Sequence, residues 1–426
     1  MRFLKRVLIA GTILCVLVEV YVYALRMAYS IPNELIAQRV QEDVVVINNT
    51  GVYPRIGRGR RTQLDLFTDR HMLNSSIQMG DTALKKAMIP SYARYWHGYQ
   101  VFLRPLLTLL HRQEIVKLYC VLFYALLLAA IYTVFRCIGS DVAIMFALSM
   151  GFSYCWAAPL SMQFMTVYVV SLIGVILSCR INNSWILFLC LGSLVNFLDF
   201  LTFPLMSLGL PLIIILLRLM YNSNYSGRQG LNTVGEAVLS WGLGYSTTWV
   251  AKWIIASYVL KTSVIQNAIQ ASFFRVAGNS QYPVNHYEAV MRNVRVFLLE
   301  IGPKTGIALL VLVLVIFRVK GILSFQGWKD FKSRCYYQWG RIVPLILVAV
   351  MPYIWYLILA NHSQIHFWFT FRNQACTFFA LGVVWLILYR NVYGDVLTTS
   401  ACIYWRRSSF IKKALFLVFC FFLFWY

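Results

Sequence analysis

Long apolar segments alternate with short polar segments along most of the chain. A window of roughly 19 residues finds about eleven of them, each close to the length of a helix that crosses a bilayer. Runs such as 205–219 are apolar on every face, whereas membrane-barrel strands would alternate with period two. The predicted transmembrane helices lie near residues 7–27, 115–135, 141–158, 163–179, 185–201, 203–220, 234–259, 304–318, 342–360, 374–389 and 412–426.

Composition supports the same class. Of 426 residues only 12% are charged, against roughly 25% in a soluble domain. In lipid, only helices and closed barrels satisfy the backbone polar groups, so we predict an all-α integral membrane protein with one polytopic domain, 1–426. The first apolar run, 7–25, is too long for a signal-peptide core and predicts an uncleaved anchor. The ten cysteines lack CxxC spacing and are predicted to be small apolar fillers.

The distribution of basic residues predicts the orientation. With the N-terminus in the cytoplasm, most lysines and arginines of the short loops fall on the cytoplasmic side. The long first loop, 29–112, then lies outside the cell membrane. The net charge of +23 is ascribed to contact with anionic lipids and not to nucleic acid. The same topology places all six histidines outside: His71, His97, His111, His286, His362 and His366.

The first loop combines a basic stretch with a carboxylate. Four arginines in RIGRGRR, residues 55–61, suit either a phosphate group or lipid head groups. Asp69 precedes an apolar-polar pattern that predicts a short helix, which Thr68 or Asp69 would cap. Beside Arg70, the Asp69 carboxylate should stay ionised, so it could instead accept a substrate proton or bind a metal.

Aromatic and charged residues mark three further places. The stretch 92–107 contains Trp96, His97 and Arg104 and suits either an amphipathic interface helix or a site for a sugar or lipid phosphate. Asp199 lies at the end of a predicted span, as a functional acid or as a simple cap. Lys252 lies inside another span, where a lysine must pair with an anion or extend to the membrane edge.

The segment NHSQIHFWFTFR, residues 361–372, is the most polar stretch between two apolar runs. His362 and His366 have i, i+4 spacing, which places them on one helix face. Such a pair can bind a metal, but HExxH and an acidic companion are absent, so no metal site is predicted. Hydrogen bonds to substrate hydroxyls, with Arg372 on a phosphate, fit better; ordinary interfacial packing is the alternative.

Together, the motifs TDRHMLN, RYWHGYQVFLRPLL, FLDFLTFP, WVAKW and IWYLILANHSQIHFWFTFR resemble a group of multi-span bacterial membrane proteins. These in turn resemble the GT-C superfamily of glycosyltransferases. The resemblance spans about residues 65–372. It implies a many-helix enzyme with amphipathic helices in its first external loop. It also implies a polyprenyl-phosphate-sugar donor and a cell-envelope glycan or lipid acceptor.

The resemblance further implies a catalytic carboxylate in the first loop. The matching position is Asp69, with Asp81 and Asp65 as substitutes. Where the family often has a second acid, this chain has Arg70, so a divalent-cation requirement stays open. The predicted site residues are Asp69 as general base and, for substrate binding, Arg70, Trp96, His97, Arg104, Asp199, Lys252, His362, His366 and Arg372.

A transporter or flippase of lipid-linked glycans is the alternative function. Such a protein would show internal repeats and broken or charged helices at mid-membrane. The sequence has no convincing repeat, and Lys252 is the one basic residue well inside a predicted span. A purely structural membrane protein would not gather its histidines and acids on one side.

Overall fold

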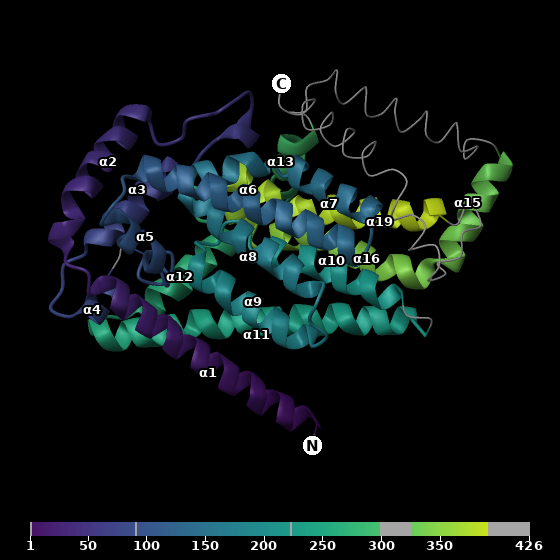
Figure 1. Cartoon of the computed structure of the whole chain (residues 1–426), viewed down its shortest axis with the longest axis horizontal. Helices are drawn as coiled ribbons and strands as arrows, with labels where there is room; N and C mark the ends of the chain where they lie inside the picture. Colours follow the sequence, from purple (N-terminus) through teal and green to yellow (C-terminus); the bar gives the residue numbers. More distant parts are fainter. Residues whose placement is uncertain (1, 90–91, 222–223, 299–324, 391–426) are drawn as a thin grey trace.

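The computed structural model describes residues 2–89, 92–221, 224–298 and 325–390 (Figure 1). Within these ranges the chain forms 18 α-helices and five 3-10 helices, with β-type pairing limited to isolated bridges. The predicted all-helical class is confirmed for this part of the chain. The α-helices are α1 (Arg2–Tyr29), α2 (Ala37–Thr50), α3 (Leu66–Asn74), α4 (Ala83–Met88), α5 (Gln100–Leu107), α6 (Arg112–Cys137), α7 (Ser140–Phe152), α8 (Met162–Ser178), α9 (Ser184–Leu198), α10 (Met206–Met220), α11 (Gly227–Leu260), α12 (Val264–Ala277), α13 (His286–Leu298), α15 (Phe325–Tyr337), α16 (Trp339–Ile358), α17 (Ala360–Ile365), α18 (Phe367–Thr370) and α19 (Ala375–Arg390).

Several of these helices have the length and composition of membrane spans. The four candidates among the described residues are Leu4–Tyr29, Arg112–Cys137, Trp339–Ile358 and Phe367–Leu388. Four shorter apolar helices, α7 to α10, lie where further spans are predicted. The chain therefore has the character of a multi-pass membrane protein. The predicted spans near 304–318 and 412–426 lie outside the described residues.

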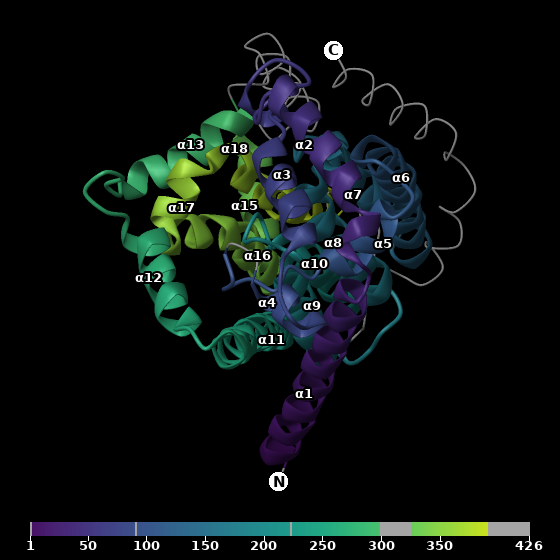
Figure 2. The ribbon, with the colours of Figure 1, turned by 90° about the vertical axis from the view of Figure 1, so that its left-hand side faces the viewer.

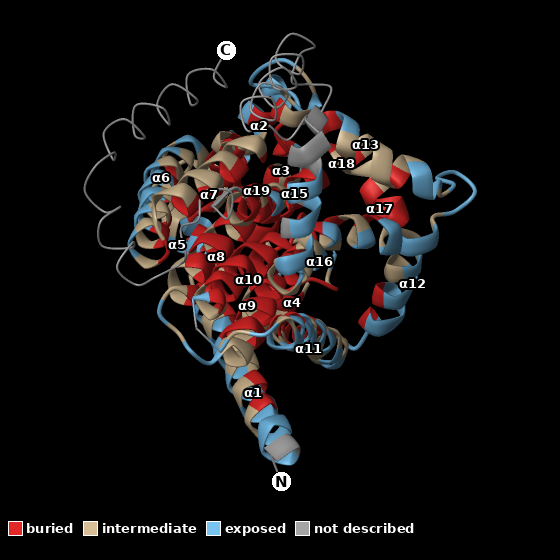
Figure 3. Cartoon of the chain, turned by 90° about the vertical axis from the view of Figure 1, so that its right-hand side faces the viewer, coloured by how far each residue is buried: buried red, intermediate tan, exposed pale blue. Residues whose placement is uncertain are grey.

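Helices α8 and α10 form the centre of the bundle and are buried on nearly every face (Figure 3). Helix α10 packs against α8, α16 and α19. An apolar run on every face is what a helix with neighbours on all sides requires. Helix α1 instead projects from the bundle and leaves apolar side chains such as Val16 and Val20 exposed. Such a surface suits contact with lipid chains.

Helices α9 and α11 pack closely because glycines lie at their contact. A Cβ atom added at Gly244 of α11 would collide with the carbonyl oxygen of Leu189, and one added at Gly192 of α9 would collide with that of Trp241. Small residues allow the backbones of membrane helices to approach closely. The two glycines therefore determine how near α9 can lie to α11.

We expect Gly244→Ala to lower the free energy of unfolding by about 1–3 kcal/mol, because the added methyl group forces the two helices apart. Gly242→Ala on the same helix is the matched control, since nothing lies within 4 Å of the added Cβ. This control should be neutral or stabilising by up to about 1 kcal/mol. Unfolding in detergent by titration with a denaturing surfactant measures both. Equal effects of the two substitutions would contradict the glycine contact.

The helices of the first loop gather at one end of the bundle (Figure 1, Figure 2). Helices α2, α3 and α5 pack around a small core of their own, which includes Val40, Leu73 and Leu103. The amphipathic pattern explains α2, whose buried residues Val40, Asp43 and Ile47 recur at helical spacing. The first loop is thus a folded cap and not an open connection.

Segments from the rest of the chain reach the same end. Arg94 Nη1 of the first loop donates to Asn267 Oδ1 of α12 over 3.1 Å. Arg372 Nη2, after α18, donates to the carbonyl oxygen of Arg61 over 3.3 Å. Helices α12, α17 and α18 lie on one side of the first-loop helices in Figure 2. We call this end of the bundle the loop end, formed by residues 29–89, 92–112, 199–205, 248–286 and 359–374.

Candidate functional site

Asp69, the predicted catalytic base, is completely buried on α3 and is bonded to the first residue of α6. Nε and Nη2 of Arg112 donate to Asp69 Oδ2 over 3.1 Å and 2.5 Å. Asp69 Oδ1 accepts from the Ser161 hydroxyl over 3.2 Å and from the backbone N–H of Gln163 over 3.4 Å. A carboxylate offers about four lone-pair positions, so these four donors occupy them. The Asp69 carboxylate joins α3 to α6 and α8.

Arg70 points elsewhere, although it is next to Asp69 in the sequence. Its Nη1 donates to Asn48 Oδ1 over 2.9 Å, and its guanidinium lies 5.5 Å from the centre of the Phe67 ring. The structure therefore does not bring Asp69 and Arg70 together. The cation that pairs with Asp69 is Arg112, which was not among the predicted residues.

The two substitute acids lie in opposite surroundings. Asp65 is buried and caps α3, since Thr68 donates to it from its backbone N–H over 3.0 Å and from its hydroxyl over 2.7 Å. Burial raises the pKa of Asp65 to about 7 despite these bonds. Asp81 is exposed, and its hydrogen bond with Lys85 lowers the pKa of its carboxyl below the usual value.

We expect the difference in thermal stability between Asp65→Asn and the wild type to rise from pH 5 to pH 8. The folded carboxyl keeps its proton up to about pH 7, whereas the unfolded carboxyl loses it near 3.8. The folded state therefore binds more protons across this window, and the wild type loses stability as pH rises through it. Asparagine caps a helix as well as aspartate does and removes this titration.

The measurement is the melting temperature in detergent at several pH values. The matched control is Asp81→Asn, whose exposed carboxyl is ionised throughout this window, so its difference from the wild type should stay flat. A flat or falling difference for Asp65→Asn would contradict the raised pKa.

Arg104, predicted to meet an anion, holds the end of α1. Its Nε donates to the Ala28 carbonyl over 2.9 Å, its Nη1 to Asn33 Oδ1 over 3.3 Å, and its Nη2 to the Ile31 carbonyl. The guanidinium also lies 4.6 Å from the centre of the Tyr29 ring. A cation at a helix C-terminus satisfies the last carbonyls and meets the negative end of the helix dipole. Arg104 is thus already engaged by the protein.

Trp96 and His97 are buried side by side. Trp96 Nε1 donates to the Thr248 carbonyl of α11 over 2.8 Å, which anchors the first loop on that helix. His97 Nδ1 lies 2.7 Å from the Tyr99 hydroxyl. Burial, followed by the charge of Lys252, lowers the pKa of His97 well below its usual value. His97 is therefore neutral at physiological pH and acts as a hydrogen-bonding group.

Lys252 of α11 is completely buried close to Trp96. Its Nζ lies 2.9 Å from the Met88 sulfur and 5.8 Å from the centre of the Trp96 ring. Among the described residues, no carboxylate forms a salt bridge with it. A thioether is a weak acceptor, and a desolvated ammonium without an anion is costly. Of the two predicted arrangements, pairing with a described carboxylate is not seen, and the Lys252 ammonium instead lies against Met88 and Trp96 of the first loop.

Asp199 closes the turn between α9 and α10. Its Oδ2 accepts from the backbone N–H of Thr202 over 2.8 Å, and its Oδ1 accepts from the Thr202 hydroxyl over 2.6 Å. Leu201 has a left-handed backbone with φ of 67°, which is unusual for a branched side chain. Asp199 therefore has the capping role that was one of its two predicted roles, and its bonds with Thr202 stabilise the turn 199–205.

This turn brings histidines from distant segments together. The Phe200 ring lies 4.9 Å from the His97 ring and 6.2 Å from the His71 ring. The neighbouring Leu201 carbonyl lies 2.8 Å from His362 Nε2. The structure thus joins the first loop, the turn 199–205 and α17.

His362 and His366 lie against each other, with ring centres 4.8 Å apart. Burial, followed by the charge of Arg275, lowers the pKa of His366 to about 4. Burial also lowers the pKa of His362 well below its usual value. Both imidazoles are therefore neutral at physiological pH, so they offer hydrogen bonds and not positive charge.

Arg372 is completely buried at a different place, among aromatic rings. Its guanidinium lies 4.5 Å from the centre of the Phe164 ring and 4.9 Å from that of Phe371. Its Nη1 and Nη2 donate to the carbonyls of Trp368 and Arg61 over 3.2 Å and 3.3 Å. Through its bond with the Arg61 carbonyl, Arg372 fixes the basic loop to the bundle.

Two arginines outside the predicted site residues face the histidines. Arg94 and Arg275 lie 5.4 Å and 5.7 Å from the centre of the same Tyr95 ring. Arg275 Nη2 donates to the Tyr95 hydroxyl over 2.8 Å. Neither arginine forms a salt bridge with a described carboxylate. We define the loop-end cluster as Arg94, Lys252 and Arg275 with His71, His97, His362 and His366.

Arg94 belongs to the aromatic-basic stretch 92–107, but the sequence prediction selected Arg104 from that stretch. Arg275 lies in the last turn of α12, where a basic residue is usual at a helix end. Nothing in its local sequence distinguishes it, so only the fold reveals it.

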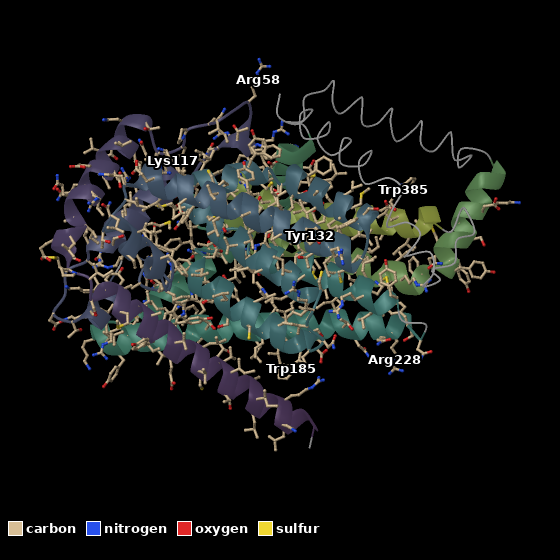
Figure 4. The ribbon with its side chains drawn as sticks, viewed as in Figure 1. Arg58, Lys117, Tyr132, Trp185, Arg228 and Trp385 are labelled. Carbon is tan, nitrogen blue, oxygen red and sulfur yellow. The ribbon has the colours of Figure 1, made fainter. Side chains whose placement is uncertain are left out.

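The basic stretch 55–61 is largely exposed. Figure 4 shows the Arg58 side chain pointing away from the helices. Arg61 is less exposed, with its guanidinium 5.5 Å from the centre of the Tyr154 ring. The exposed members fit the predicted contact with lipid head groups, and the stretch lies outside the loop-end cluster.

Within the described ranges, no three His, Cys, Asp or Glu side chains gather as a metal site would require. The loop-end cluster instead gathers cations and imidazoles, of which those of His97, His362 and His366 are neutral, and such a set suits an anion with hydroxyl groups nearby. Comparison with known proteins gives no match to any protein family, curated protein or solved structure.

Proposed function

We propose that the chain is a membrane glycosyltransferase of GT-C type with about eleven spans and a cytoplasmic N-terminus. It would transfer a sugar from a polyprenyl-phosphate donor to a cell-envelope glycan or lipid on the extracytoplasmic face. The observation that carries the proposal is the loop-end cluster, in which buried Arg94 and Lys252 and half-buried Arg275 gather beside imidazoles without a salt bridge to a described carboxylate. A phosphate supplied by the substrate would offset the cost of burying those charges.

In the proposed reaction, an acceptor hydroxyl attacks the anomeric carbon of the sugar. The bond between that carbon and the phosphate oxygen breaks, and polyprenyl phosphate leaves with the electron pair. The hydroxyl proton passes to a carboxylate acting as general base. Arg94, Arg275 and Lys252 would stabilise the phosphate oxygens, which is usually the largest single contribution. Neutral His97 and His366 would bind sugar hydroxyls.

The identity of the base has two candidates. Asp69 is the one that the GT-C resemblance implies, and accepting a proton there requires a donor such as Arg112 to move. Asp69 and His71 are two positions apart on α3, so they point to nearly opposite sides of that helix. Asp199 is the second candidate because it is adjacent to Phe200, which packs within the loop-end cluster; its carboxylate accepts from Thr202 and also interacts with the backbone N–H groups of Phe200 and Leu201.

The proposal is tested with purified wild-type protein reconstituted in vesicles with a radiolabelled polyprenyl-phosphate sugar and membrane glycan acceptors. We expect label to appear in the acceptor fraction and lipid phosphate to be released. Movement of the labelled lipid across the bilayer without bond formation would contradict this function and favour the transporter alternative. Glycan analysis of a deletion strain would then identify the missing sugar.

A further inference from the structure

Helix α12 has two unlike faces. Ile265, Ile269, Phe273 and Val276 recur at helical spacing and are all exposed, with Phe273 at 69%. Asn267 and Arg275 lie on the opposite side and bond with the first loop. An apolar stripe backed by a polar face is typical of a helix that lies in the membrane interface.

The inward face of α12 meets Arg94, which is 9% exposed. Arg94 Nη1 has Asn267 as partner, while its buried Nε has none among the described residues, and the same holds for Arg275 Nε. Burial, with an added effect of nearby Arg275, lowers the pKa of Arg94. Two neighbouring arginines over one tyrosine ring repel each other, so an anion between them would stabilise both.

The position of Arg94 is fixed before any ligand arrives. Its backbone carbonyl accepts from Trp249 Nε1 over 2.9 Å and from Trp253 Nε1 over 3.1 Å. Trp249 also stacks on Tyr95 with ring centres 5.8 Å apart. Two indoles of α11 therefore hold the loop in place, and a site that is preorganised in this way loses little entropy on binding.

We propose that Arg94 and Arg275, with the Tyr95 hydroxyl, form a lipid-phosphate site, and that α12 lies in the membrane interface beside it. The phosphate binds between the arginines, and the hydrocarbon chain of the same molecule runs along the apolar stripe of α12. This inference rests on the proposed function and assigns the lipid end of its donor. A soluble phosphate could occupy the arginines as well, but only a lipid would use both faces of the helix.

The test measures binding of three probes to the purified full chain in detergent micelles: farnesyl phosphate, farnesol and inorganic phosphate. We expect farnesyl phosphate to bind more tightly than both others. Arg94→Gln and Arg275→Gln should each weaken its binding roughly tenfold or more, since each removes a charge-assisted hydrogen bond. The matched control is Arg292→Gln on α13, because Arg292 already has Glu288 as counter-ion at 3.0 Å.

Phe273→Ser tests the membrane part of the site. It should weaken farnesyl phosphate severalfold and leave inorganic phosphate unchanged. Equal binding of inorganic phosphate and farnesyl phosphate in the wild type would overturn the lipid assignment. An equal loss in Arg292→Gln and Arg275→Gln would overturn the arginine pair.

Arg275→Lys is the conservative variant that separates loss of the phosphate site from misfolding. Lysine keeps the positive charge but lacks the two-pronged geometry of arginine. This variant should elute as a folded protein and bind farnesyl phosphate between the wild type and Arg275→Gln. Since the probes carry no sugar, the binding experiment tests the lipid-phosphate site separately from the proposed sugar transfer. Binding without sugar transfer would leave the site and contradict the transferase, whereas transfer that survives Arg94→Gln and Arg275→Gln would contradict the site alone.

Discussion

Exchange of Arg112 for leucine is expected to lower the free energy of unfolding by about 3–5 kcal/mol, because it leaves a buried carboxylate without its partner. Asp69 is completely buried, and the Arg112 side chain is only 13% exposed. The remaining donors to Asp69, from Ser161 and Gln163, are neutral and do not replace the lost charge. Surfactant-induced unfolding in detergent measures the change.

Lys117→Leu is the matched control for this substitution. Lys117 lies on the same helix, little more than a turn from Arg112, and is exposed. Its replacement should change stability by no more than about 0.5 kcal/mol. The double variant Arg112→Leu with Asp69→Leu removes both charges and should recover much of the loss. If Arg112→Leu were as stable as the wild type, the ion pair would not anchor α3.

Asp69→Asn is expected to reduce sugar transfer by about 10²–10⁴-fold if Asp69 is the base, which is the usual contribution of general-base catalysis. The amide keeps the shape of the side chain and can still accept from Arg112, so the protein should remain folded. Its new N–H group faces the backbone N–H of Gln163, which adds a moderate loss of stability. The reconstituted transfer assay, at a temperature where the variant is folded, measures the effect.

Asp199→Asn is the companion variant. Asparagine can keep the hydrogen bonds with Thr202, so the turn 199–205 should survive. If transfer falls in Asp199→Asn and persists in Asp69→Asn, then Asp199 is the base and Asp69 is an anchor. Wild-type transfer in Asp69→Asn would rule out Asp69 as the base in any case.

The positions of the helices follow from the sequence with little ambiguity. The predicted ranges 115–135 and 163–179 correspond closely to α6 and α8. The predicted range 141–158 is shorter as an α-helix: α7 ends at Phe152, and a 3-10 helix containing Pro159 follows. Proline restricts the residue before it and lacks a backbone N–H, which explains a change of helix type near it.

The candidate site was less predictable, because an arginine can bind either a ligand or carbonyl oxygens of its own chain. Arg104 and Arg372 have the residue type expected for phosphate binding, yet Arg104 already binds oxygen atoms of the protein through three nitrogens and Arg372 through Nη1 and Nη2. The buried Nε of Arg372 has no partner among the described residues. Arg94 and Arg275, which keep an unpartnered Nε each among the described residues, have no stronger local pattern. Residue type alone does not show whether a buried guanidinium has been satisfied by its own chain.

The sequence by itself determined the all-helical class, the presence of apolar helices of membrane-spanning length and the approximate helix positions. These properties depend on hydrophobicity and charge along short stretches, which act locally. Only the tertiary structure decided that Asp69 pairs with Arg112, 43 positions away, and that Arg94 meets Asn267, 173 positions away. Such pairs depend on how separate helices pack, and the free energy of a buried charge depends on whichever group that packing brings to it.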